Sequence, residues 1–324
     1  MTHIHFISPN KRNDLISKRN GEQKIGECIR FASDLNWDSE IEYVILGVPE
    51  DIGVLANYGN KGAENAFDAF LKRFLNMQAN QYIELSKVLI LGALDIEDLK
   101  VNVVQSSDIN TLREKVEIID ARLSELIALI QSKNAKPIVI GGGHNNSYGI
   151  IKGLGQKSPI EVLNIDPHFD YRICEGRHSG NGFRYAKEAG FLSKYSVFGF
   201  HQNYNNQTML DDMQEEKSFC LTSFESILFI KHTMEEAISK HFEFHGSKIG
   251  VELDLDSVKD MPTSAYTPSG FSEEDIRKLL YKTRKEKDVL YYHFAEGAPL
   301  DPIQNSKVGK FLAYLVADIL SINN

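Results

Sequence analysis

Short apolar runs alternate with amphipathic stretches along most of the chain. Seven runs rich in β-branched and aromatic residues indicate strands, at residues 41–48, 87–91, 137–140, 160–165, 195–198, 248–253 and 289–294. Residues 111–132 repeat apolar side chains three or four positions apart, which predicts a helix with one apolar face. Strands separated by helices are typical of a mostly parallel sheet that is covered by helices on both faces. The pattern therefore predicts an α/β fold.

No internal repeat, low-complexity tract or Pro/Ser-rich linker interrupts this pattern. A chain of 324 residues is long enough for two domains, but α/β sheets of this length often form one. We expect residues 1–324 to form a single domain, with residues 1–40 as an N-terminal extension. The uncharged polar tract at 202–207 predicts a loop.

Composition excludes several classes of partner. Lys and Arg number 36 against 45 Asp and Glu, a net charge of −9, and no basic run is dense enough to follow a phosphate backbone. We therefore expect no nucleic acid and no anionic membrane as a partner, and the apolar runs are too short to span a bilayer. The 42% hydrophobic and 25% charged fractions are those of a globular protein instead of a disordered one.

The three cysteines, Cys28, Cys174 and Cys220, are widely spaced and form neither a disulfide framework nor a CxxC metal site. This favours a reducing compartment. The first ten residues lack the basic and apolar regions of a secretory signal. A cytoplasmic location is the resulting expectation.

Potential metal ligands follow three of the predicted strands. In an open parallel sheet, ligands bind beyond the carboxyl ends of the strands. Three glycines precede the first ligand, and the other two groups repeat at alternate positions, which in extended chain project the same way. The six side chains are His144, Asp166, His168, Asp170, Asp254 and Asp256.

Four carboxylates that share one pocket repel one another and need positive charge. No cluster of Lys or Arg neighbours these motifs, so a metal is the favoured source. Carboxylates and imidazoles without thiolates suit Mn²⁺, and less selectively Zn²⁺, Co²⁺ or Fe²⁺. Six ligands exceed the need of one ion with an open position, and two ions roughly 3.5–4 Å apart would hold a nucleophilic hydroxide. Each motif alone also has a plainer interpretation, as a turn, a helix cap or a loop.

In this order, the motifs resemble those of the arginase/agmatinase/formimidoylglutamase family, the ureohydrolases. Residues 47–63 are similar to the family's first strand and glycine-rich loop, and residues 292–299 to a late segment whose glutamate lies near the substrate's amidine or guanidine group. The resemblance covers nearly the whole chain. It implies a three-layer α/β/α sandwich around an eight-stranded parallel sheet, two Mn²⁺ ions, attack of a bridging hydroxide on a C=N carbon, and a trimer or hexamer.

The resemblance also implies roles for individual residues. The metal ligands would be the six side chains named above, with His168 and Asp256 completing the second site. Asp170 would also orient the hydroxide, and Glu296 would pair with the cationic nitrogen of the substrate. An ordinary acidic residue at the start of a helix is the other interpretation of Glu296.

Several positions bear on the substrate. Gly143 agrees with the formimidoylglutamase branch, because arginases have Asp there, and Phe183 replaces the histidine that shuttles protons in arginase. Arg172 could bind a substrate carboxylate as a bidentate fork, or form a structural salt bridge. Ser179 and Asn181 are the other candidate substrate-binding residues.

Other positions depart from the family's pattern. His178 either replaces the lost proton shuttle or is an exposed loop histidine. Asn145 and Asn146 follow the motif histidine in place of an acidic residue or Ser. Glu252 stands where a small hydroxyl residue is common, and Asp260 is displaced from its usual place, so the last metal loop is expected to be reshaped, with a changed substrate or weak metal retention as a consequence.

The first hypothesis is a Mn²⁺-dependent hydrolase that converts N-formimidoyl-L-glutamate to L-glutamate and formamide, a step of histidine degradation. N-formimidoyl-L-glutamate has two carboxylates, so this hypothesis favours extra arginines near the mouth of the site, such as Arg172, Arg177 or Arg184. An agmatinase or another guanidino-acid hydrolase is the alternative within the class. A catalytically silent ureohydrolase-fold binding protein is the alternative from another class, and the retention of all six ligands argues against it.

Overall fold

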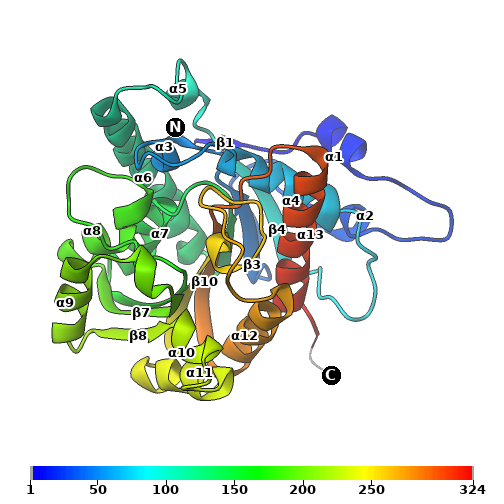
Figure 1. Cartoon of the computed structure of the whole chain (residues 1–324). Helices are drawn as coiled ribbons and strands as arrows, with labels where there is room; N and C mark the ends of the chain where they lie inside the picture. Colours follow the sequence, from blue (N-terminus) through cyan, green and yellow to red (C-terminus); the bar gives the residue numbers. More distant parts are fainter. Residues whose placement is uncertain (1–2, 323–324) are drawn as a thin grey trace.

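A ten-stranded, mostly parallel sheet forms the centre of the protein (Figure 1), for which the computed structural model describes residues 3–322. The order across the sheet is β1-β4-β3-β5-β10-β9-β6-β7-β8, and β2 pairs with β4 off this path. The strands are β1 (Ile4–His5), β2 (Arg30–Phe31), β3 (Tyr43–Gly47), β4 (Val88–Leu94), β5 (Lys136–Ile140), β6 (Ile160–Ile165), β7 (Leu192–Phe200), β8 (Phe219–Ser223), β9 (Lys248–Asp254) and β10 (Asp288–Ala295).

The eight strands from β4 to β8 in this order run parallel, as predicted, and the seven expected strands are all among them. The pattern missed β8 at the edge of the sheet. It also missed β1, which is antiparallel to β4, and β2. These last two strands have two residues each, too few to show a period, and they join the segment expected as an N-terminal extension to the same sheet.

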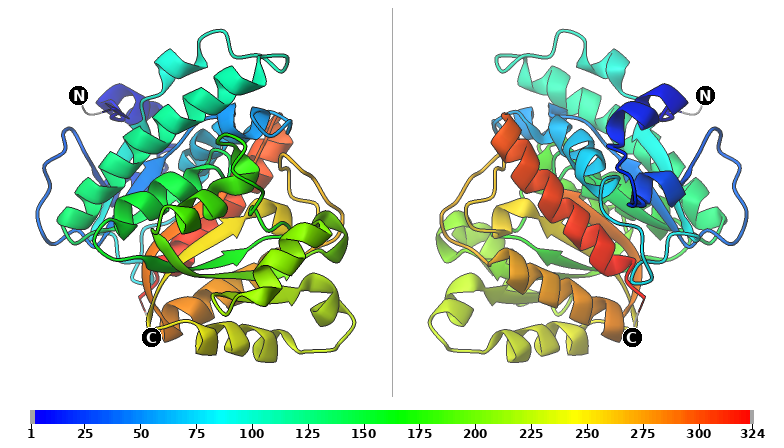
Figure 2. Two further views of the ribbon diagram at one scale, coloured as in Figure 1. Left: turned by 90° about the vertical axis from the view of Figure 1, so that its left-hand side faces the viewer. Right: turned by 90° about the vertical axis from the view of Figure 1, so that its right-hand side faces the viewer.

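Helices cover both faces of the sheet, which confirms the three-layer α/β/α architecture (Figure 2). The α-helices are α1 (Pro9–Leu15), α2 (Ile25–Cys28), α3 (Ile52–Leu55), α4 (Ala66–Phe74), α5 (Glu97–Lys100), α6 (Ile109–Ser132), α7 (Asn146–Gly155), α8 (Gly182–Glu188), α9 (Gln207–Glu215), α10 (Phe224–Leu228), α11 (Met234–Phe244), α12 (Glu273–Glu286) and α13 (Pro302–Ile319). Single 3₁₀ turns lie at η1 (Ala63–Asn65), η2 (Ser179–Asn181), η3 (Gln202–Tyr204) and η4 (Leu255–Ser257).

Two apolar cores result, one on each side of the sheet. Helices α4, α11, α12 and α13 pack on one face, and α3, α6, α7, α8 and α9 pack on the other. The helix expected at 111–132 begins two residues earlier, because the side chain of Asp108 accepts a hydrogen bond from the Thr111 amide and caps it. None of the helices within residues 3–322 has the length and apolarity needed to cross a membrane.

The tract at 202–207 is only partly the loop that was expected. Gln202–Tyr204 form a 3₁₀ turn, and α9 already begins at Gln207. The side chain of Asn206 accepts a hydrogen bond from the Met209 amide, so this residue caps the helix instead of extending the loop.

We expect a buried histidine to make the fold acid-sensitive. His241 on α11 is fully buried with Nε2 2.9 Å from the hydroxyl of Thr222, and burial lowers its pKa to about 3. The unfolded chain, with a His pKa of about 6.5, therefore binds a proton that the folded chain does not. This histidine's stabilising contribution is intact above pH 6.5 and is lost as the pH falls toward 3, at a cost of about 2 kcal/mol at pH 5.

The check is urea unfolding at pH 7.5 and pH 5. His241→Gln keeps a hydrogen-bonding group beside Thr222 but cannot titrate, so its free energy of unfolding should fall by about 2 kcal/mol less than that of the wild type. Equal pH dependence of the two proteins would contradict the assignment.

Candidate metal centre

The six predicted ligands come together at the carboxyl ends of adjacent strands. The neighbours β5, β10, β9 and β6 lie in the middle of the sheet. His144 follows β5, Asp166 follows β6, Asp254 ends β9 and Glu296 follows β10. Because β9 and β10 are inserted between β5 and β6, the connections diverge here and leave a crevice, which is the usual position of a ligand site in such sheets.

The glycine turn before His144 has the role that the sequence predicted. Gly141 and Gly142 adopt φ angles of 89° and 73°, which L side chains rarely adopt. The Gly141 amide donates to the carbonyl of Phe294, and the Glu296 amide donates to the carbonyl of Gly142. The turn is thereby fixed to the end of β10, with His144 at its tip.

A buried carboxylate that the sequence analysis missed supports this turn. Glu50 is fully buried, and it accepts hydrogen bonds from the amides of Gly53 and Gly143 and from the side chain of Asn146. Burial raises the pKa of Glu50, and these three donors oppose that rise. Asn146 therefore holds the loop from below. The position of Glu50 just after a predicted strand was the available signal.

Two groups of donor atoms face each other in the crevice. Around the Nδ1 atom of His144 lie carboxylate oxygens of Asp166 at 3.1 Å, Asp170 at 2.9 Å and Asp254 at 3.2 Å. The second group joins His168 to Asp254 and Asp256, and the other oxygen of Asp166 lies 3.5 Å from the Nδ1 atom of His168. Asp166 and Asp254 are therefore common to both groups.

The donor atoms fit divalent cations better than they fit one another. The two nitrogens of His144 and Oδ1 of Asp256 are buried without a hydrogen-bond partner among residues 3–322. Burial, followed by the charges of Asp256 and Asp166, raises the pKa of Asp254 well above its usual value, and burial raises the pKa of Asp256 to about 6. A cation between these groups would relieve the repulsion. The oxygen and nitrogen donors, without sulfur, suit Mn²⁺ and similar ions.

Glu296 faces a cavity of about 270 Å³ that opens above both donor groups. One of its oxygens accepts the amide hydrogen of His144 at 2.7 Å, and the other accepts the hydroxyl hydrogen of Ser264. Burial, followed by the charge of Asp256, raises the pKa of Glu296 to about 8. The alternative that Glu296 caps a helix is wrong, because α13 begins at Pro302 and Asp301 caps it.

Arg172 and Ser179 line the same cavity. The Arg172 guanidinium donates to the side-chain oxygen of Asn57 at 3.1 Å and to Glu175 at 3.0 Å, and it keeps 46% of its side-chain surface exposed. The Asn57 amide donates to the hydroxyl of Ser179. Sequence reasoning singled out neither Asn57 as a partner of Arg172 nor Ser264 as a partner of Glu296.

The structure does not place Asn181 on the cavity. This residue is fully buried, and its side-chain oxygen accepts hydrogen bonds from the guanidinium of Arg177 and the amide of His178. It orders the loop that carries Ser179. The short spacing from Ser179 could not reveal this, because the loop turns Asn181 inward at the start of α8.

The expectation of several arginines at the mouth is wrong for two of them. Arg177 is 2% exposed, donates to Asp120 at 2.8 Å, and lies between two tyrosine rings. Arg184 on α8 pairs with Glu188 and Asp212, away from the cavity lining. Arg172 is the arginine that reaches the cavity in the described part of the chain.

Both interpretations of His178 are also wrong. The side chain is fully buried instead of exposed, and it is not part of the cavity lining, where a proton shuttle would have to be. Its Nδ1 atom accepts the amide hydrogen of Gly180 at 3.1 Å. Burial, followed by the nearby charge of Arg172, lowers the pKa of His178 to about 3.

Comparison with known proteins identifies the family and the fold. Residues 41–321 match the model of the arginase family. The chain belongs to the arginase family. A formimidoylglutamase from Streptococcus pyogenes serotype M12 is 28% identical over 294 residues, which cover 85% of this chain and 84% of that protein. Among solved structures, a Trypanosoma cruzi formiminoglutamase with Mn²⁺ has a TM-score of 0.73 at 21% identity and covers 92% of this chain and 98% of its own.

A formimidoylglutamase from Bacillus subtilis also shares the fold, with a TM-score of 0.73 at 17% identity over 93% of both chains. Within this arginase-family fold, Phe183 is a packing residue. Its ring lies edge-on to the imidazole of His144 at 5.2 Å and stacks on Tyr195 at 4.4 Å. An apolar ring therefore closes one side of His144.

We expect the two donor groups to lose ions separately. Asp256→Asn removes a carboxylate of the second group, so the protein should keep one divalent ion and bind the other far more weakly. Asp166→Asn removes a carboxylate that faces both groups and should weaken both ions. Equilibrium dialysis of chelator-treated protein against Mn²⁺, followed by elemental analysis, measures this.

Asp260→Asn is the matched control, because Asp260 is an exposed aspartate four residues further along the same loop. It should bind as the wild type does. If Asp256→Asn bound two ions with unchanged affinity, the assignment of Asp256 as a metal ligand would be wrong.

Proposed function

We propose that this member of the arginase family hydrolyses N-formimidoyl-L-glutamate to L-glutamate and formamide. The observation that carries the proposal is the cavity itself, which has both donor groups at its base, Glu296 beside them and Arg172 on its wall. The formimidoylglutamase of S. pyogenes, similar over 85% of this chain, supports the same substrate. Water adds to the C=N carbon, the bond from that carbon to the glutamate nitrogen breaks, and formamide leaves.

Two Mn²⁺ ions are proposed as the cofactor. His144, Asp166, Asp170 and Asp254 would hold one ion, and His168, Asp166, Asp254 and Asp256 the other. Two divalent ions held by these residues would lower the pKa of water and make it nucleophilic near neutral pH. The T. cruzi formiminoglutamase was solved with Mn²⁺, which supports this choice of metal.

Asp170 is proposed to orient the attacking water and to accept its proton. Its carboxylate lines the cavity, and its backbone has a φ angle of 45°, an uncommon conformation for a residue other than glycine. This conformation turns the side chain back toward His144, 2.9 Å away. The chain thus bears local strain at the position where the reaction needs a fixed acceptor.

Glu296 is proposed to bind the amidinium group. Its two oxygens already accept hydrogen bonds from the His144 amide and from Ser264, so the carboxylate is fixed in orientation. A cationic N–H group arriving in the cavity would stabilise the ionised carboxylate, which burial otherwise disfavours. Charge complementarity would place the C=N carbon above the donor groups.

Arg172 is proposed to bind a substrate carboxylate, with Asn57 and Ser179 beside it. Its guanidinium is partly exposed in the cavity, with one nitrogen on Asn57 and another in the salt bridge to Glu175 that was the alternative interpretation. A guanidinium fork pairs well with a carboxylate. Agmatine is cationic at both ends and has no carboxylate, so Arg172 argues against an agmatinase. Convergence of all six donor side chains argues against a silent binding protein.

The experiment measures hydrolysis of four compounds by chelator-treated protein, with and without added Mn²⁺. The compounds are N-formimidoyl-L-glutamate, agmatine, L-arginine and guanidinobutyrate. We expect Mn²⁺-dependent turnover of the first compound, and we expect Asp170→Asn to lower kcat by orders of magnitude. Turnover of agmatine in preference would favour the alternative. Two bound ions with no turnover of any compound would overturn the proposed substrate.

Arg172→Ala should raise KM for N-formimidoyl-L-glutamate by about tenfold or more, the effect of losing one charge-assisted contact of about 1.4 kcal/mol. For any residual agmatine hydrolysis, KM should not rise. Steady-state kinetics with both compounds measure this. Arg184→Ala is the control, since Arg184 pairs with Glu188 and Asp212 outside the cavity. If Arg172→Ala raised KM equally for both compounds, Arg172 would have a structural role instead of a role in binding a carboxylate.

A further inference from the structure

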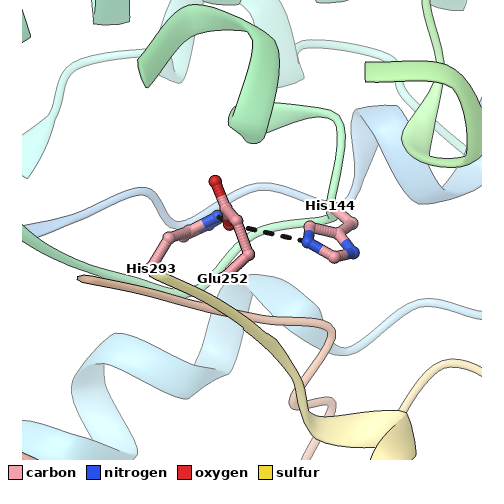
Figure 3. Close-up of side chains that lie close together, drawn as sticks. All are labelled: His144, Glu252 and His293. Atoms are coloured by element: carbon pink, nitrogen blue, oxygen red, sulfur yellow. Dashed lines mark hydrogen bonds and ion pairs between the residues drawn. The ribbon is translucent and has the colours of Figure 1, made fainter. Parts of the chain in front are cut away.

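A second polar layer lies behind the metal centre, between strands β9 and β10. Alternation along β9 places Gly250, Glu252 and Asp254 on one face of the sheet. In the register of the two strands, Glu252 is the partner of His293 and Gly250 is the partner of Tyr291. Figure 3 shows Glu252 and His293 together on one side of His144, which comes from the loop after β5.

Glu252 is fully buried and tightly held. One of its oxygens accepts the hydroxyl hydrogen of Tyr291 at 2.7 Å, and the other lies 2.5 Å from Nδ1 of His293. A Cβ atom at Gly250 would lie 2.1 Å from the ring of Tyr291, so glycine provides the space that this tyrosine occupies. Two strands therefore cooperate to fix one carboxylate.

The remaining neighbour of this carboxylate is His144. Its Nε2 atom lies 3.5 Å from the oxygen of Glu252 that His293 also approaches. Nε2 of His144 is buried and has no hydrogen-bond partner within residues 3–322. A buried N–H group without an acceptor costs free energy, and Glu252 offers a carboxylate oxygen at the right side of the ring.

His144, Glu252 and His293 are close enough together for their donor atoms to be considered as a third ion site, but Glu252 and His293 lie too close to each other to share one ion. Two atoms bound to one ion at about 2.0–2.2 Å lie roughly 3 Å apart or more. The 2.5 Å separation of Glu252 and His293 is instead that of a short hydrogen bond. In addition, Nδ1 of His144 faces the three carboxylates of the first donor group.

We propose that Glu252 is a positioning residue for His144, which accepts the Nε2 hydrogen and so directs the Nδ1 lone pair at the first ion. Tyr291 and His293 hold Glu252 in place for this role. Ligating histidines commonly give their other ring hydrogen to a carboxylate, which fixes the tautomer and orients the ring. The inference rests on the proposed two-ion centre, and it gives a purpose to Glu252, a departure from the ureohydrolase pattern.

Glu252→Gln tests this, because it keeps the shape of the side chain but presents a poorer and differently oriented acceptor. The affinity of the first donor group for Mn²⁺ should fall roughly 10–100-fold, while that of the second group stays unchanged. Equilibrium dialysis of chelator-treated protein resolves the two affinities. At saturating Mn²⁺, the kcat of Glu252→Gln should return to the wild-type value and its KM should be unchanged. If Glu252 bound the substrate, KM would rise even at saturating Mn²⁺.

Glu161→Gln is the matched control. Glu161 accepts from His245, at 3.1 Å from Nδ1, in another part of the same sheet, and that histidine belongs to neither donor group. It should leave both Mn²⁺ affinities at wild-type values. Tyr291→Phe removes one hydroxyl that holds Glu252 and should lower the first affinity several-fold, which keeps a test available should Glu252→Gln fail to fold.

The outcomes separate this inference from the proposed function. Wild-type protein that binds two Mn²⁺ ions, with unchanged affinities in Glu252→Gln and Tyr291→Phe, would overturn the role of Glu252 alone. Three ions in the wild type, with one lost in Glu252→Gln, would overturn it in favour of a further metal site. Wild-type protein that binds no Mn²⁺ would overturn both proposals.

Discussion

The need to place four aspartates within a few ångströms of one another governs this structure. These residues lie after the carboxyl ends of two strands: Asp166 and Asp170 follow β6, and Asp254 and Asp256 lie at the end of β9. Burial disfavours their charged forms and raises the pKa of Asp254 and Asp256. Partial compensation comes from His144 and His168, which lower the pKa of Asp166 despite its burial. Imidazoles alone do not remove the repulsion. The site therefore has the donor set and the uncompensated negative charge of a metal-binding cluster.

Alternation along the central strands lets one segment serve both the core and the centre. On β9, Val251 and Leu253 enter the apolar core beneath α12 and α13, while Glu252 and Asp254 face the opposite side. A shift of one residue in register would exchange these sets. Asp254 is thereby held by the same pairing that stabilises the sheet, while the other candidate ligands lie in the segments that follow the strands.

The parts that the sequence predicted are those that depend on local period and strand ends. The candidate ligands from Asp166 to Asp170 and at Asp254 and Asp256 were predictable because they follow strand ends. The extended chain expected for them was wrong, because Asp256 lies in a 3₁₀ turn and Asp170 has a φ angle of 45°. The places of Arg177, His178 and Asn181 were not predictable, because they depend on a loop that folds back on Asp120 and Gly180. Some of these contacts join residues far apart in the sequence, and others depend on the dihedral angles of a loop. Neither kind leaves a periodic pattern in the sequence.

The cavity separates charge along its length, and this decides how a substrate would lie in it. Glu296 and the aspartates make the base acidic, while Arg172 on the wall is cationic, contacts Asn57 and Glu175, and keeps 46% of its side-chain surface exposed. A molecule with a cationic amidine at one end and a carboxylate at the other gains from both regions in one orientation and loses in the reverse one. A substrate with two cationic ends could pair one end with Glu296, but its other end would be repelled by the guanidinium of Arg172. Charge pairing of the two ends with Glu296 and Arg172 would thus set the orientation of such a molecule before any chemistry takes place.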